Sequence, residues 1–229
     1  MFRFTNILIA GLLLAAGAST AHAQVVISQV NGAGGNTGAT YNKGSVELFN
    51  RGSSAQSLAG WSLQYASATG TGSFSGNVTA LSGSIPAGGY FLISLGGGAT
   101  GAALPTPDAT GTTAMGGSGG KVILANVSTG LACNGSSTPC NSTQLGQIVD
   151  LVGYGNANYF EGSAAAPAPS STLSDFRADG GCTDTDQNGA DFSTAAAAPR
   201  NSASPTAQCA GGGTPAISGL RVGPGARSL

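Results

Sequence analysis

The sequence predicts an all-β domain, a small β-sandwich with long loops rich in Gly, Ser and Thr. Apolar and polar residues alternate from Trp61 to Tyr65, which is the pattern of a strand with one buried face. The chain contains 39 glycines among many small polar residues, as expected of short strands joined by turns. Charged residues make up only 7% of the chain, so amphipathic helices are poorly supported.

Further strands are expected wherever a short apolar run stands between turn signals. The turn at Pro86 and the glycines after it, for example, leads into an apolar run. We expect about five to seven strands in one domain. The clearest runs are 25–30, 45–52, 58–65, 90–93, 121–125 and 147–154.

The segments between these runs are expected to be irregular. The glycine-rich stretch 96–120 is predicted to be an exposed loop or a mobile insertion. Residues 174–177 are expected to form a short turn, and 184–191 a tight polar loop with Phe192 as its buried anchor.

The first 23 residues are predicted to be a signal peptide. Arg3 supplies a positive charge, residues 7–16 form an apolar core, and Ala21 and Ala23 give the small-residue pattern of a cleavage site. A retained anchor is the alternative, but the apolar run is short for a membrane span. We therefore expect a cut after Ala23 and a secreted or cell-surface protein. It would comprise a domain at 24–209 and a disordered Gly/Pro-rich tail at 210–229.

Cleavage after Ala23 would limit the chemistry of the mature chain. His22 is the only histidine and would leave with the leader. A Ser-His-Asp triad and a histidine-ligated zinc site are then excluded. The whole chain carries eight basic and nine acidic residues, so no basic stripe is present to bind a phosphate backbone.

The four cysteines predict two disulfides, because an even number in a secreted chain is usually paired. Three pairings are open. Proximity favours Cys133 with Cys140 and Cys182 with Cys209. Loop-closure entropy gives about 2.5 kcal/mol for the short loop and about 3.6 kcal/mol for the long one.

The candidate metal site is the loop that begins at Asp184. Oxygen-bearing residues at alternate positions before a glycine match the first half of a calcium loop, and any site would be weak because Ala195 stands where the twelfth-position acid is expected. The alternative is a loop whose side chains cap their own backbone. No other cofactor is expected. The candidate ligands are Asp184, Asp186, Asn188 and Asp191.

Two other residues have competing interpretations. Trp61 is expected in the core, with an exposed aromatic platform as the alternative. Glu47 is expected to accept hydrogen bonds, or to pair with Arg51 or Lys43 at the sandwich edge. An acid-based hydrolase using Glu47 or Asp150 is the catalytic alternative.

Several motifs together resemble the lamin-tail domain family, in particular its extracellular bacterial branch. They are ELFN at 47–50, LAGWSL at 58–63 and PAGGY at 86–90, followed by the runs at 121–124 and 150–154. The run GCTDTD at 181–186 extends the resemblance to about residue 205.

The resemblance implies an immunoglobulin-like β-sandwich that serves as an interaction module. No catalytic residue is expected, and the partner would be an unidentified extracellular protein, polysaccharide or DNA. Bacterial relatives often carry nuclease or phosphatase domains, so an accessory subunit of such an enzyme is a further alternative.

Overall fold

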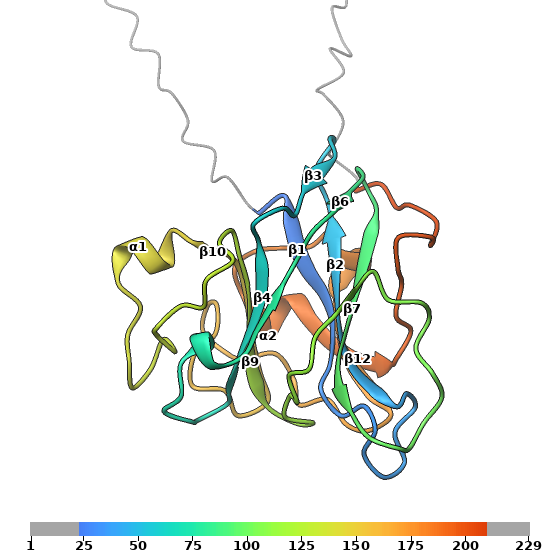
Figure 1. The fold of residues 1–229 in the computed structure, drawn as a ribbon, viewed down its shortest axis with the longest axis horizontal. Helices are drawn as coiled ribbons and strands as arrows, with labels where there is room; N and C mark the ends of the chain where they lie inside the picture. Colours follow the sequence, from blue (N-terminus) through green and yellow to red (C-terminus); the bar gives the residue numbers. More distant parts are fainter. Residues whose placement is uncertain (1–22, 210–229) are drawn as a thin grey trace, which may run out of the picture.

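The computed structural model describes residues 23–209, which form a sandwich of two main sheets (Figure 1). The larger sheet has the strand order β12-β11-β1-β2-β7-β8. All its pairings are antiparallel except that of β7 with β8. Its strands are β1 (Val25–Asn31), β2 (Lys43–Asn50), β7 (Tyr90–Gly97), β8 (Ala109–Thr110), β11 (Leu173–Arg177) and β12 (Phe192–Ala196).

The smaller sheet is antiparallel, with the order β10-β9-β4-β5. Its strands are β4 (Ser62–Ser67), β5 (Val78–Ala80), β9 (Gly120–Ala125) and β10 (Ile148–Tyr154). A short ribbon joins β3 (Gln56–Ser57) to β6 (Ser84–Ile85). The described helices are single turns: η1 (Phe74–Gly76), α1 (Ser142–Leu145), η2 (Ala178–Gly181) and α2 (Asn188–Asp191).

The core lies between the two main sheets, because the inward rows of both are apolar except at β11. Val46 and Leu48 of β2 face Val122 and Leu124 of β9 in one buried cluster. A smaller cluster around Phe74 covers the other face of β9 and β10. Several strands are therefore buried on both faces, and most of their sequences show little alternation. The strand β4 does alternate, but its polar Ser62 and Gln64 are buried too, so the prediction of one buried face at 61–65 is wrong.

All six clear runs form strands, and the all-β sandwich is confirmed. The expected number of strands is wrong, because the described residues contain twelve. The short strands β3, β5, β6 and β8 were missed because their sequences contain no apolar run. The stretch 96–120 is not simply an exposed loop: it contains β8, and Met115 is 9% exposed within the core.

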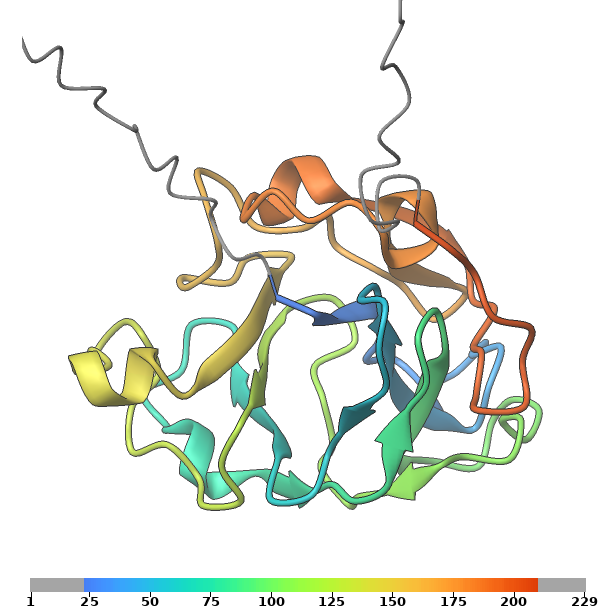
Figure 2. The ribbon, with the colours of Figure 1, turned by 90° about the horizontal axis from the view of Figure 1, so that it is seen from above.

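The expected turn at 174–177 is also wrong, since these residues belong to β11. With β12, this strand continues the larger sheet beyond β1, and Figure 2 shows this C-terminal part of the chain in orange along one side of the sandwich. Phe192 is buried as expected. Trp61 is partly buried and packs against the main core.

No helix among residues 23–209 is long and apolar enough to cross a membrane. The predicted leader, apart from Ala23, and the predicted tail at 210–229 lie outside the described residues.

Candidate functional site

A cluster of buried charges joins the two sheets, with Arg177 of β11 at its centre. The Arg177 side chain is 0% exposed. Its Nη2 donates to both oxygens of Asp150 in β10 at 2.9 Å, and its Nη1 donates to Asp184 at 2.9 Å. Asp191 lies 3.5 Å from the same Nη1, and Arg51 donates to Asp184 at 2.8 Å. The cluster therefore links β10, β11 and the loop after η2.

A bulge in β1 gives this cluster its backbone partners. The register of β1 against β2 shifts between Ile27 and Gln29, and β11 pairs with β1 only from Gln29 onward. A bulge leaves backbone groups unpaired. The Ile27 N–H donates to Asp150 at 2.5 Å, and the Ile27 carbonyl accepts from Arg177 Nε at 3.0 Å. The two charged side chains thus satisfy the backbone that the bulge exposes.

Burial dominates the electrostatics of the cluster. It raises the pKa of Asp150, and Arg177 opposes that rise. Burial and the nearby Asp150 raise the pKa of Glu161 to about 8. Burial acts to lower the pKa of Arg177, but the surrounding carboxylates outweigh it and raise that pKa. Removing one partner of such a group leaves the others charged and desolvated, which is costly.

The four candidate calcium ligands have different surroundings in the folded chain. Asp184 accepts from two arginines. The Asn188 side chain accepts from the Gly153 N–H at 2.9 Å and donates to the Leu151 carbonyl at 2.9 Å. Those contacts anchor Asn188 to β10 rather than aim it at a common centre with Asp184.

Asp191 serves the loop itself, as the capping alternative expects. It accepts from the N–H and the hydroxyl of Thr185 at 2.9 and 2.7 Å. Burial opposes its ionisation, but the hydrogen bonds from Thr185 and Gln187 outweigh burial and lower its pKa. Asp186 lies close enough to Glu161 for its charge to raise the pKa of Glu161.

A second carboxylate group, Asp150, Glu161 and Asp184, has oxygen atoms within 4.8 Å of one another. The guanidinium of Arg177 already donates to two of these acids, and Glu161 accepts from the Asn188 side chain at 3.1 Å. The donor set would suit calcium by chemistry alone. However, Arg177 already places a positive charge against these carboxylates, so the group is poorly suited to bind a metal cation as well.

Glu47 pairs with a different residue from the two expected. Its strand β2 is interior to the larger sheet, and the side chain is 1% exposed. It pairs with Arg200, whose Nη2 lies 2.7 Å from Glu47 Oε1. Arg51 pairs instead with Asp184. Glu47 does accept hydrogen bonds, from the Ser28 hydroxyl at 2.5 Å and the Arg200 backbone N–H at 2.6 Å, as one alternative expected. The other alternative, an edge pair with Arg51 or Lys43, is wrong, because the chain after β12 returns to cover this face.

Asp175 is a buried acid of a different kind. It lies two residues before Arg177, on the same inward face of β11, opposite Val30 and Thr194. The residue is 0% exposed, and neither carboxylate oxygen has a hydrogen-bond partner among the described residues. Burial raises the pKa of Asp175 to about 8. It is therefore an acid that the fold holds neutral near physiological pH.

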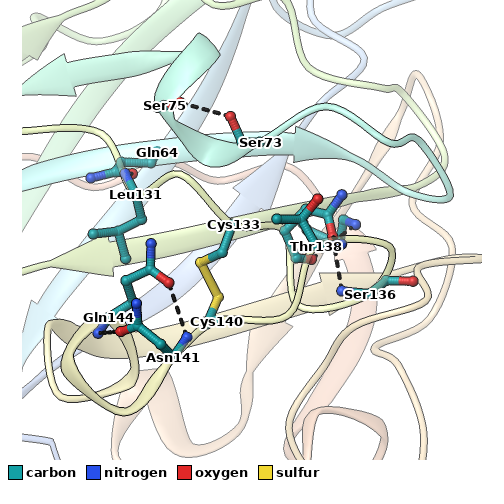
Figure 3. Close-up of a disulfide and its surroundings, with 12 residues drawn as sticks. Gln64, Ser73, Ser75, Leu131, Cys133, Ser136, Thr138, Cys140, Asn141 and Gln144 are labelled. Atoms are coloured by element: carbon teal, nitrogen blue, oxygen red, sulfur yellow. Dashed lines mark hydrogen bonds between the residues drawn. A yellow bond between two sulfur atoms is a disulfide. The ribbon is translucent and has the colours of Figure 1, made fainter.

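Both expected disulfides are confirmed. Cys133 pairs with Cys140 and Cys182 with Cys209, at Cα–Cα distances of 5.0 and 5.4 Å. Figure 3 shows the first beside the start of α1, where the side chains of Asn141 and Gln144 each accept from the other's backbone N–H at 2.9 Å. The second brings the end of the described chain back to η2. Both bonds indicate an oxidising environment.

The comparisons with known proteins agree with this fold. The family model described as Lamin Tail Domain matches residues 18–156, more than half of the chain. The chain belongs to the lamin tail domain family. A comparison with curated proteins finds no match. The resemblance to the extracellular bacterial branch stays a prediction.

The match to the lamin tail domain family ends before β11, so it contains Asp150 but not Arg177. Sequence reasoning found Asp150 and Glu47 but missed their arginines. The available signal was weak: Arg177 ends an alternating run, LSDFR, whose inward positions include two charged residues. Charged residues at core positions of a strand point to partners elsewhere in the core.

Proposed function

We propose that this lamin tail domain is a non-catalytic binding or structural module, secreted or held at the cell surface. The observation that supports this proposal best is that three buried carboxylates of the domain are engaged in ion pairs with arginines of the same chain. Glu47, Asp150 and Asp184 each bind an arginine that fastens the C-terminal strands or the chain after them. Their oxygens are directed at the protein itself, and general acid–base catalysis requires a group within reach of substrate.

The cysteines support the same proposal. All four are consumed by two disulfides, so a thiolate nucleophile is not offered by residues 23–209. The bonds also favour a place outside the reducing cytosol. The partner would be an extracellular protein, polysaccharide or DNA, met through loops or an open sheet edge such as β5 or β12.

Affinity capture from native culture medium with the purified domain as bait, followed by mass spectrometry, tests the binding role. We expect a partner that co-elutes with the wild-type domain and not with heat-unfolded bait.

A parallel screen of the same protein against nucleic acids, phosphoesters and glycans tests the catalytic alternative. We expect no turnover. Turnover that Glu47→Gln abolishes without a change in fold would contradict the proposal and support an acid-based hydrolase.

A further inference from the structure

The chain after β12, residues 197–209, here called the strap, covers the outer face of the larger sheet. It begins with mutual hydrogen bonds between Ala198 and the Gln29 side chain, at 3.1 and 3.2 Å. Further on, the Ala207 N–H donates to the Gly88 carbonyl at 2.8 Å, and Cys209 closes the disulfide. The strap therefore lies across β1, β2 and the turn before β7.

Arg200 of the strap inserts its side chain into a site whose other members belong to the sandwich and to η2. Its Nε and Nη2 donate to the two oxygens of Glu47 at 3.1 and 2.7 Å. Its Nη1 donates to the Tyr90 hydroxyl at 2.7 Å, and Nη2 reaches the Gly180 carbonyl at 3.4 Å. The guanidinium carbon lies 3.8 Å from the centre of the Tyr90 ring.

These contacts involve two features of a guanidinium that an ammonium lacks. The forked donors meet a carboxylate with two bonds, and the flat face stacks on an aromatic ring. A lysine ammonium has neither the fork nor the flat face. The site is therefore selective for guanidinium by geometry as well as by charge.

The walls of the site are held by groups other than the Arg200 side chain. The Arg200 backbone N–H donates to Glu47 Oε2 at 2.6 Å, a contact that Arg200→Ala would keep. Ser28 donates to Glu47 Oε1 at 2.5 Å, and Gln29 reaches Glu47 Oε2 at 3.4 Å. The Tyr90 ring packs against Phe49, with centroids 4.9 Å apart. Because Glu47 and Tyr90 stand on neighbouring interior strands, the site would keep its shape when the arginine is absent.

The site also has an approach from solvent. The Arg200 side chain is 29% exposed. Arg200 also lines a cavity of about 450 Å³, whose other lining residues are Phe176, Arg177, Ala178, Gly180, Ser193 and Ala198. This mostly apolar hollow between β11 and the strap gives room for the residues that would flank an incoming side chain.

We propose that Glu47, Tyr90 and Gly180 form a binding site for an arginine side chain of a partner protein, which Arg200 fills in cis. The strap is then an internal ligand, and a partner binds by displacing Arg200. That the partner is a protein rests on the proposed binding function. That the site prefers a guanidinium group rests only on its geometry.

Chemical rescue tests the site directly. Arg200→Ala empties it, and thermal unfolding is followed as methylguanidinium is added at about 1–20 mM. We expect a saturable rise in Tm for Arg200→Ala, with little change for wild type, whose site is filled. Methylammonium at the same concentration and the double variant Arg200→Ala/Glu47→Gln are the controls, and neither should show the rise.

Absence of a saturable rise in Arg200→Ala, or an equal rise in the Glu47→Gln double variant, would overturn the proposal. Arg200→Gln is the second variant if Arg200→Ala does not fold, because it fills more of the site without the guanidinium. The same titrations apply to it.

The partner is tested with immobilised peptides that differ only in one arginine or lysine. We expect Arg200→Ala to bind the arginine peptide more tightly than wild type does, and to ignore the lysine peptide. Equal binding of both peptides would overturn the partner assignment. Turnover in the catalytic screen would instead remove the proposed function and leave the rescue result unaffected.

Discussion

The part of the molecule up to β10 and the segment from residue 157 to 209 are held in different ways. The first part is joined by apolar side chains from two facing sheets. The second contributes Ala166 and Phe192 to that main core. It also packs apolar groups against the small cluster of Phe49 and Tyr90, and the Cys182–Cys209 bond closes a loop within the segment. What sets the segment apart is its buried ion pairs with the sandwich, Arg177 with Asp150 and Arg200 with Glu47.

The boundary between the two parts coincides with the end of the family match at residue 156. The sandwich supplies fixed acids on β2 and β10, and the C-terminal segment supplies the arginines that meet them. Apolar contacts change little with pH or charge, whereas buried ion pairs depend on both partners. We therefore expect the C-terminal segment to respond to charge changes that leave the first part intact.

The largest expected effect comes from Arg177→Met. Asp150 and Asp184 would stay buried without their main counter-charge, so the free energy of unfolding should fall by about 3–5 kcal/mol. Urea unfolding measures it. Arg51→Ala is the matched control, because Arg51 is partly exposed and shares Asp184. It should cost about 1 kcal/mol or less. Equal costs would mean that burial does not set the strength of these pairs.

Removing the Cys182–Cys209 bond with alanines should come next, with a loss of about 3.6 kcal/mol from loop-closure entropy. The same change at Cys133 and Cys140 should cost about 2.5 kcal/mol, because that loop is shorter. Unfolding under non-reducing conditions compares the two. A larger loss at the short loop would show that local packing, and not loop length, decides the outcome.

Asp175→Asn should stabilise the protein relative to wild type by an amount that grows as pH rises. The folded-state pKa of about 8 lies well above the usual value of 3.8. Between these values the folded state keeps a proton that the unfolded state has lost, so stability falls as pH rises from about 4 to about 8. The asparagine variant does not lose stability in this way, because it has no proton to release at residue 175. The contribution of Glu161 to the pH dependence is the same in both proteins.

Unfolding of wild type and Asp175→Asn at pH 5 and pH 8.5 measures the effect. We expect the variant's advantage to be larger at pH 8.5 than at pH 5, by up to about 1.4 kcal/mol for each pH unit between 5 and 8. A pH-independent difference would mean that Asp175 has a hydrogen-bond partner in solution.

Calcium is expected to have the smallest effect. The oxygens of Asp184 and Asp191 already accept hydrogen bonds from arginine, threonine and glutamine groups. Thermal unfolding in EDTA and in about 5 mM calcium should therefore give the same Tm within about 1 °C. A saturable rise that Asp184→Asn removes would establish the calcium loop.

The sequence predicted the apolar strands, both disulfides and the family, because each leaves a local pattern. It did not predict β11 and β12, since LSDFR places two charged residues at inward positions. Asp150 and Glu47, which pair with Arg177 and Arg200, lie 27 and 153 residues away from them. No local spacing encodes such pairings, because they arise only when the sheets have come together. For the same reason the pairing of Glu47 with Arg200 was not predicted, and Arg51 or Lys43 was expected instead.

Hydrogen–deuterium exchange of wild type, Arg177→Met and Arg51→Ala tests the central claim most directly, namely that buried charge fastens the C-terminal strands to the sandwich. Peptides covering β11 and β12 should exchange faster in Arg177→Met, while β2, β7 and β9 keep their protection. Arg51→Ala should resemble wild type. Unchanged protection of β11 and β12 in Arg177→Met, or uniform loss over all strands, would contradict the account.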